Sequence, residues 1–149
     1  MANQPTDKIR SYDYPASTVS RANGGFDKDD REVVGRWVTQ QADGSVLLTA
    51  DNERPTGVIM TLGATKVGVG MGPYVTGKQA GSTKIPIDSW ITGATKKVVT
   101  GGTAERGFVK AVDASSAALQ NTSIGFVTAS VDTVDETEGE PTTEVYRWR

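Results

Sequence analysis

The side chains that perform most acid–base and nucleophilic chemistry are missing from this sequence. It contains no histidine and no cysteine, which removes the commonest general base, the commonest transition-metal ligand and the thiolate nucleophile. Nucleophile systems that pair Ser or Cys with His are therefore excluded. The chemistry that stays open is that of two carboxylates, which can act as acid and base at a glycosidic bond.

The positions of the carboxylates do not favour such a pair. Most of the 18 Asp and Glu residues fall in two polar segments, residues 27–32 and 132–144. The central region adds single carboxylates that stand mostly beside turn residues: Asp43, Asp51, Glu53, Asp88, Glu105 and Asp113. A hydrolase based on Asp88 or Glu105 is an alternative, but we expect that the protein is not an enzyme and binds no cofactor.

Residues 72–79 follow the phosphate-loop pattern of nucleotide-binding proteins up to their last position. There Gln79 replaces the Ser or Thr whose hydroxyl binds magnesium. A helix must also follow such a loop so that its N-terminus faces the phosphates, whereas residues 80–86 contain Gly81 and Pro86. Both differences argue against nucleotide binding.

Two further stretches suggest ligands and are better explained without them. Residues 27–32 place carboxylates close together, as a calcium-binding loop does. A calcium loop that began at Asp27 would need Gly at its sixth position and Glu at its twelfth, but Glu32 and Val38 stand there instead. Residues 68–72 alternate Gly-x-Gly-x-Gly, which is not the dinucleotide fingerprint. We expect a solvated loop in the first case. In the second we expect a strand whose bare glycine face allows close approach of a neighbouring group.

The composition favours strands over helices. Seventeen glycines and abundant Thr, Val and Ser suit strands that are joined by tight turns. Asp43 and Gly44 stand between two apolar runs and predict a β-hairpin. Turn residues separate nine segments that we expect to be strands: residues 32–39, 45–49, 56–62, 66–71, 84–87, 97–100, 106–112, 124–131 and 144–149. We therefore predict an all-β fold, a small β-barrel or sandwich.

The chain of 149 residues is long enough for one domain with tails. Residues 1–30 hold few aliphatic side chains and predict an extended N-terminal arm. Residues 31–132 are the expected β-rich core domain. Residues 133–149 are the expected acidic linker and C-terminal strand.

Five aromatic residues in the two outer parts are candidates for contacts with another subunit. Tyr12, Tyr14 and Phe26 lie in the expected arm, where they would pack either on the chain's own domain or on a neighbour. Tyr146 and Trp148 share one face of the expected terminal strand. That strand could pair with its own sheet or with a neighbour's edge.

The net charge of −2 gives no electrostatic reason to approach nucleic acid or an anionic membrane. The first residues lack the apolar stretch of a secretory signal, and no apolar run approaches the roughly 18 residues of a membrane span. We expect a soluble protein that is made in the cytoplasm and contacts neither nucleic acid nor membrane.

Four short stretches carry a family resemblance: residues 57–60, the strand through Gly68 and Gly70, residues 90–93, and residues 124–129. Through them, residues 56–131 resemble the capsid decoration, or cement, proteins of tailed bacteriophages. The resemblance implies a small β-barrel or sandwich with extended termini. It also implies assembly, commonly as a trimer, on the outer shell, where such proteins clamp coat subunits, and it brings no catalytic residues.

The resemblance and the missing chemistry together predict a structural virion protein. We expect it to be made in the host cytoplasm and to lie on the capsid surface, where it binds the major capsid protein and further copies of itself as a homotrimer. Bridging of coat subunits would stabilise the shell. The alternative is a carbohydrate- or surface-binding β module of a virion tail that uses exposed Trp and Tyr side chains.

Overall fold

The computed structural model describes residues 8–112, 125–130 and 141–147, and these residues form an all-β fold. Two short 3-10 turns, η1 (Arg21–Asn23) and η2 (Arg31–Val33), lie between the first two strands. The strands are β1 (Ile9–Asp13), β2 (Trp37–Gln40), β3 (Val46–Leu48), β4 (Gly57–Leu62), β5 (Lys66–Gly70), β6 (Tyr74–Lys78), β7 (Ile91–Lys97), β8 (Ala104–Ala111), β9 (Gly125–Ser130) and β10 (Thr142–Arg147).

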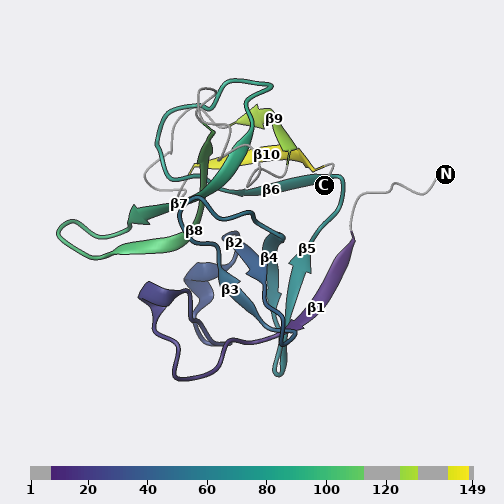
Figure 1. The fold of residues 1–149 in the computed structure, drawn as a ribbon, viewed down its shortest axis with the longest axis vertical. Helices are drawn as coiled ribbons and strands as arrows, with labels where there is room; N and C mark the ends of the chain where they lie inside the picture. The colour runs from purple at the N-terminus through teal and green to yellow at the C-terminus, as the bar shows by residue number, and fades with distance from the viewer. Residues whose placement is uncertain (1–7, 113–124, 131–140, 148–149) are drawn as a thin grey trace.

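The strands form three sheets in which all neighbouring strands are antiparallel. A five-stranded sheet has the order β1-β5-β4-β2-β3, a three-stranded sheet has the order β6-β10-β9, and β7 and β8 form a hairpin. In Figure 1 the three-stranded sheet lies across one end of the five-stranded sheet, and one end of the hairpin projects to the side. The arrangement is compatible with the predicted sandwich-like all-β fold.

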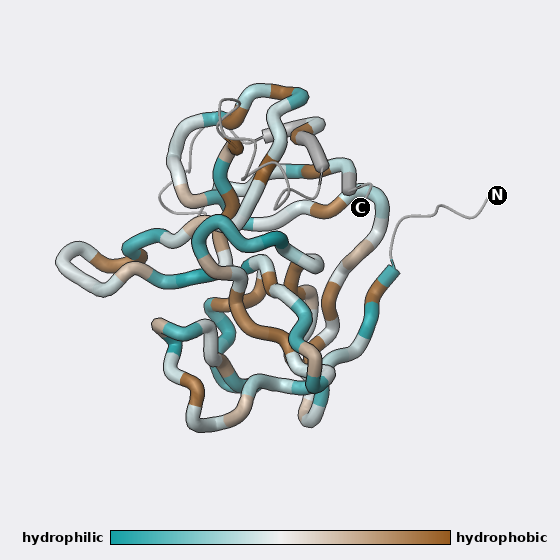
Figure 2. Tube along the Cα trace, viewed as in Figure 1, coloured by the Kyte–Doolittle hydropathy of each residue, from teal (hydrophilic) through white to brown (hydrophobic). Residues whose placement is uncertain are grey.

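The core consists of two apolar clusters on opposite faces of the five-stranded sheet. Successive side chains of a strand point to opposite faces. In β2, Val38 belongs to a cluster with β1, β3, β5 and the segment that carries Phe26, while Trp37 belongs to a cluster with the second and third sheets. In β4, Ile59 belongs to the cluster of Val38, and Val58 belongs to the cluster of Trp37. Figure 2 shows the apolar residues gathered along these inner strands.

A row of residues crosses the five-stranded sheet on its Trp37 face. Trp37 pairs with Val58, Val58 with Gly70, and Gly70 with Ile9 at the sheet edge. Strand β6 covers the first part of the row so closely that a Cβ on Gly77 would lie 2.4 Å from Trp37 Nε1. The cover ends before the edge, because Trp37 is 0% exposed and Ile9 is 52% exposed.

Two local predictions from the sequence are confirmed. Asp43 and Gly44 lie in the turn between β2 and β3, where Gly44 has a positive φ of 89°. Hydrogen bonds from the side chain and backbone of Ser45 lower the pKa of the Asp43 carboxyl. In β5 the apolar face is buried, and the space beside the glycines is occupied: Thr61 and Ile9 cover Gly68.

Several predicted strand positions are wrong. Residues 84–87 form no strand, since Pro86 has no amide to donate to a ladder. Residues 98–101 are the turn of the β7–β8 hairpin, and only Lys97 of the predicted strand belongs to β7. The predicted strand at residues 32–39 begins later, at Trp37, because η2 precedes it. Strands β1 and β6, and most of β7, were not expected.

The described part of the N-terminal segment differs from the expected extended arm over residues 1–30. Strand β1 is the edge strand of the larger sheet, and it pairs with β5 from Ile9 to Asp13. Residues 20–36 then return to the same sheet through η1 and η2. This segment packs on its own domain because it supplies apolar side chains, including Tyr12 and Val33, that close one face of the core.

The C-terminal strand pairs with its own sheet. Strand β10 lies between β6 and β9, and its Val145 is fully buried. A strand with partners on both sides offers no edge to a neighbour. Residues 113–124 and 131–140, which include most of the expected acidic linker, lie outside the described residues, as does Trp148.

The β7–β8 hairpin reaches furthest from the body of the molecule (Figure 1). Its turn contains Val99, which is 64% exposed, and Gly101, which has a positive φ of 76°. No other atom lies within 4 Å of a Cβ built on Gly101. The turn is therefore open to solvent at Val99 and Gly101.

Candidate functional site

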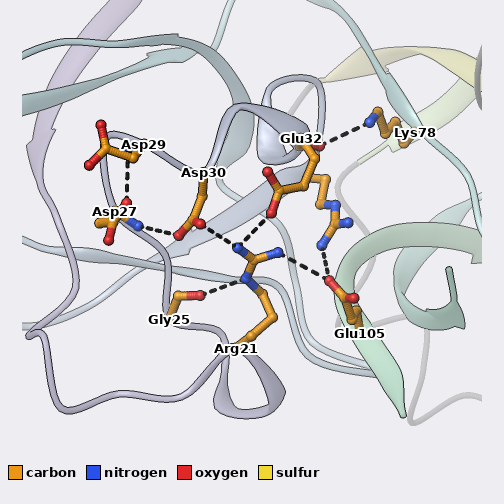
Figure 3. Close-up of polar contacts among 9 residues, drawn as sticks. Arg21, Gly25, Asp27, Asp29, Asp30, Glu32, Lys78 and Glu105 are labelled. Carbon is orange, nitrogen blue, oxygen red and sulfur yellow. Dashed lines mark hydrogen bonds and ion pairs between the residues drawn. The ribbon is translucent and has the colours of Figure 1, made fainter. Parts of the chain in front are cut away.

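An ion cluster around Arg21 joins the N-terminal segment to β8 (Figure 3). The Arg21 guanidinium donates to the Gly25 carbonyl (3.1 Å) and forms ion pairs with Asp30 (3.1 Å), Glu32 (2.9 Å) and Glu105 (3.2 Å). Partial burial alone would lower the pKa of Arg21, but hydrogen bonds and charges of these carboxylates raise it. All three guanidinium nitrogens are engaged by carbonyl and carboxylate groups of the protein itself.

Arg36 is the most buried charged residue that this cluster contains. Its side chain is 2% exposed, pairs with Glu105 at 2.8 Å and lies 5.0 Å from the centre of the Phe108 ring. Burial would raise the pKa of Glu105, but the two arginines outweigh it and the pKa is lowered. We refer to Arg21, Asp30, Glu32, Arg36 and Glu105 as the Arg21 cluster.

The acidic loop before η2 is occupied by its own hydrogen bonds. The backbone N–H of Asp27 donates to Asp30 Oδ2, and that of Asp29 donates to Asp27 Oδ1, both at 2.8 Å. Within the described residues, no three acidic side chains are grouped so that they could hold a metal ion. The Arg21 cluster and this loop therefore fix the chain path, and their geometry suits a structural role.

The segment that resembles a phosphate loop is a strand. Residues 74–78 form β6, and no helix follows them in residues 79–86. Lys78 Nζ donates to the carbonyl of Glu32 (3.1 Å), and the buried Gln79 side chain donates to the carbonyls of Gly81 and Thr83 at 2.8 and 2.7 Å. In the motif, Gly77 allows β6 to pack closely against Trp37, and Lys78 donates to the carbonyl of Glu32. Residues 74–78 form a strand and not a phosphate-binding loop.

Three of the five aromatic interface candidates contact the protein's own core. Tyr12 and Phe26 are buried, at 7% and 6% exposure. Tyr14 packs edge-on against Phe26 with ring centres 5.9 Å apart, and its hydroxyl donates to the Gly63 carbonyl at 2.6 Å. Burial raises the pKa of Tyr14. Tyr12 and Phe26 are not accessible to a second subunit in this fold.

The C-terminal candidates lie elsewhere. Tyr146 is half-buried on β10 and packs edge-on against Tyr74 of β6, with ring centres 5.3 Å apart. Tyr74 is 52% exposed, and no sequence pattern singles it out, because its strand is not among those expected. Trp148 lies outside the described residues, so the structure brings together only one of the two C-terminal candidates with another aromatic ring.

An exposed apolar hollow lies where the starts of β1 and β6 approach each other. Its volume is about 380 Å³, and it is lined by Lys8, Ile9, Met60, Gly70, Gly72, Tyr74, Val75 and Thr76. Three of these side chains are large, apolar and half exposed: Ile9 (52%), Met60 (50%) and Tyr74 (52%). We name this hollow the β1 groove.

The position of the β1 groove explains its apolar character. It continues the row from Trp37 to Ile9, beyond the point where β6 stops covering the sheet. The space between the sheets is thus filled by side chains at one end and open to solvent at the other. Exposed apolar surface that is continuous with a core is typical of a surface that another molecule covers.

No helix in the described residues has the length and apolar character needed to cross a bilayer. Comparison with known protein-family models, curated proteins and solved structures finds no match for this chain.

Proposed function

We propose that the protein is a structural component of a bacteriophage-like shell. It would bind the outer surface of the assembled capsid and stabilise it by bridging coat subunits. The observation that carries the proposal is the β1 groove, an open apolar surface beside the β1 edge of the five-stranded sheet. The resemblance of residues 56–131 to decoration proteins supports the choice of partner.

The proposal gives the protein no catalytic or cofactor-dependent role. The sequence lacks His and Cys, and the one dense group of charged side chains described above is consumed by internal ion pairs. The partners would be the major capsid protein and other copies of this chain as a homotrimer. The protein would be located on the virion surface after synthesis in the host cytoplasm.

The direct test mixes purified protein with emptied shells of a candidate phage that lack their own decoration protein. We expect saturable co-sedimentation and a higher disruption temperature, because a ligand that binds only the assembled state stabilises it by mass action. Shells whose disruption temperature is unchanged at saturating protein would contradict the proposal.

The fold changes how the termini should be tested. Deleting residues 1–30 would remove β1 and Phe26 from the core, so lost binding would report only unfolding. Deleting residues 1–7 or 148–149 leaves every described strand intact. A loss of shell binding in either short deletion would assign a contact to that terminus.

A second candidate function is carbohydrate binding at a virion tail. The observation that favours it is the exposed Tyr74 ring beside Tyr146, since sugars stack on exposed aromatic faces. A glycan array with wild-type protein and Tyr74→Ala tests this directly. A glycan signal that Tyr74→Ala abolishes would favour this function over shell binding.

A further inference from the structure

We infer that the open edge of β1 accepts an extended segment of the coat protein as an added strand, with acidic and apolar residues alternating along that segment. The inference rests on the proposed shell-binding function and names the chemistry of the contact. It is carried by three observations: the free backbone groups of β1, the distribution of side chains on its two faces, and the β1 groove beside it.

The backbone of β1 has free hydrogen-bonding groups on its outer side. The Lys8 carbonyl accepts from Met71 N–H, so the groups of Lys8, Arg10 and Tyr12 point toward β5. Those of the alternate residues point outward. Asp13 uses its outward N–H to bond the Gly44 carbonyl at 3.1 Å. Within the described residues, the outward groups of Ile9 and Ser11 have no partner, which is the geometry of strand addition.

The two faces of β1 require different side chains on an added strand. Ile9 lies on the face of the β1 groove, next to Met60 and Tyr74. By strand alternation the side chains of Lys8 and Arg10 point to the opposite face, although Lys8 also lines one end of the groove, and both residues are exposed. No described residue forms an ion pair with either cation. A strand beside β1 would therefore place apolar side chains over the groove and carboxylates beside Lys8 and Arg10.

The same charges argue against pairing of β1 with a second copy of itself. An antiparallel β1–β1 pair would bring the Lys8 and Arg10 side chains of two copies together, and like charges across a ladder destabilise it. Cationic side chains on an edge strand prevent self-association. They favour an acidic partner, which makes the edge selective as well as open.

The first test uses a defined peptide probe and amide NMR. The probe is a blocked heptapeptide of alternating Glu and Val, and the control peptide has Lys in place of Glu. We expect saturable shifts of the Ile9 and Ser11 amides with the acidic peptide, weaker binding at high salt, and no saturable shifts with the basic peptide. Equal binding of both peptides, or shifts confined to other strands, would overturn the inference.

Two variants of equal charge change separate the edge from the rest of the surface. K8E/R10E reverses the cations of β1, whereas K84E/K97E reverses two exposed lysines outside the groove. K8E/R10E should reduce affinity for the acidic peptide about tenfold or more, and K84E/K97E should change it less than about twofold. Equal losses in both variants would show a general charge effect and would contradict strand addition at β1.

Shell binding by the same variants distinguishes failure of this inference from failure of the proposed function. If K8E/R10E binds shells as tightly as wild type, the shell function stands and the β1 contact is wrong. If wild type binds the acidic peptide but no shells, the choice of coat protein as partner is wrong. Loss of shell binding in K8E/R10E alone, with K84E/K97E unaffected, is the result that we expect.

Discussion

Arg36 is a buried cation that needs a nearby carboxylate to neutralise its charge. It is 2% exposed, and the only carboxylate paired with it in the described residues is that of Glu105. Its Nε has no hydrogen-bond partner among the described residues. A buried cation without a counter-charge is costly, so Glu105 controls whether this part of the core is stable.

Replacing Glu105 by Gln should therefore destabilise the fold by about 3 kcal/mol, because a buried arginine loses its charge partner. Urea unfolding at neutral pH measures the change. Glu32→Gln is the matched control, since Glu32 also pairs with Arg21 but is 57% exposed at its side chain. The control should cost less than about 1 kcal/mol. Similar losses in both variants would contradict this role of Glu105.

The stabilising effect of Glu105 should depend on pH in one direction. The folded protein holds the pKa of Glu105 below its ordinary 4.5, so the unfolded chain takes up the proton first on acidification. The contribution is fully present above pH 4.5 and is lost as the pH falls through the lowered folded value. Wild type and Glu105→Gln should thus differ in stability at neutral pH and converge in acid. A constant difference across this range would contradict the assignment.

Gly77 allows β6 to lie directly on Trp37. A Cβ at this position would lie 2.4 Å from Trp37 Nε1 and 2.7 Å from Val58 Cγ2, which is far inside contact distance. Gly77→Ala should cost about 2 to 3 kcal/mol through overpacking. Gly81→Ala is the control, because the nearest atom to its Cβ is 3.9 Å away. Thermal unfolding of both variants checks the prediction, and an unchanged midpoint for Gly77→Ala would contradict it.

At the scale of single elements, β1 should show alternating amide protection. The N–H groups of Arg10 and Tyr12 point toward β5, while those of Ile9 and Ser11 point to the open side. Hydrogen exchange followed by NMR should find the first pair protected and the second pair fast. Uniform protection of all four amides would mean that the outer edge is already covered in the isolated protein.

The sequence predicts those elements in which local chemistry and packing agree. Asp43 and Gly44 predict the β2–β3 hairpin because positive φ is a local property of glycine. The alternation of apolar residues at Val67 and Val69 predicts β5, because it is typical of a strand with one buried face, and both side chains are buried. The interpretation of residues 1–30 as an arm was wrong for its described part because few apolar residues suffice when partner strands supply the rest of the burial.

The candidate site was beyond sequence analysis for a related reason. Ile9, Met60 and Tyr74 come from three strands that are far apart in sequence, and two of those strands were not expected. Their juxtaposition depends on the register of β1 with β5 and on how far β6 covers the five-stranded sheet. Neither quantity has a local signature. The aromatic residues that were selected are prominent in sequence, yet Tyr12 and Phe26 are buried.

The whole molecule should unfold as one unit. Strands β2 and β4 each contribute to both apolar clusters, Trp37 and Val58 to one and Val38 and Ile59 to the other. Losing either cluster removes support from strands that the other one needs, which favours a two-state transition. Urea curves from far-ultraviolet circular dichroism and from tryptophan fluorescence should have the same midpoint. Two separated midpoints would show that the clusters unfold independently.

The projecting β7–β8 hairpin makes this protein a convenient carrier for foreign sequence. Its turn contains the exposed Val99 and Gly101, whose surroundings are open. A peptide inserted beside Gly101 would enter and leave outside the folded body, at the cost of one exposed turn hydrogen bond between Gly102 N–H and the Val99 carbonyl. An epitope or affinity tag placed there would be displayed away from β1, and so without obstructing the edge that we assign to the coat protein.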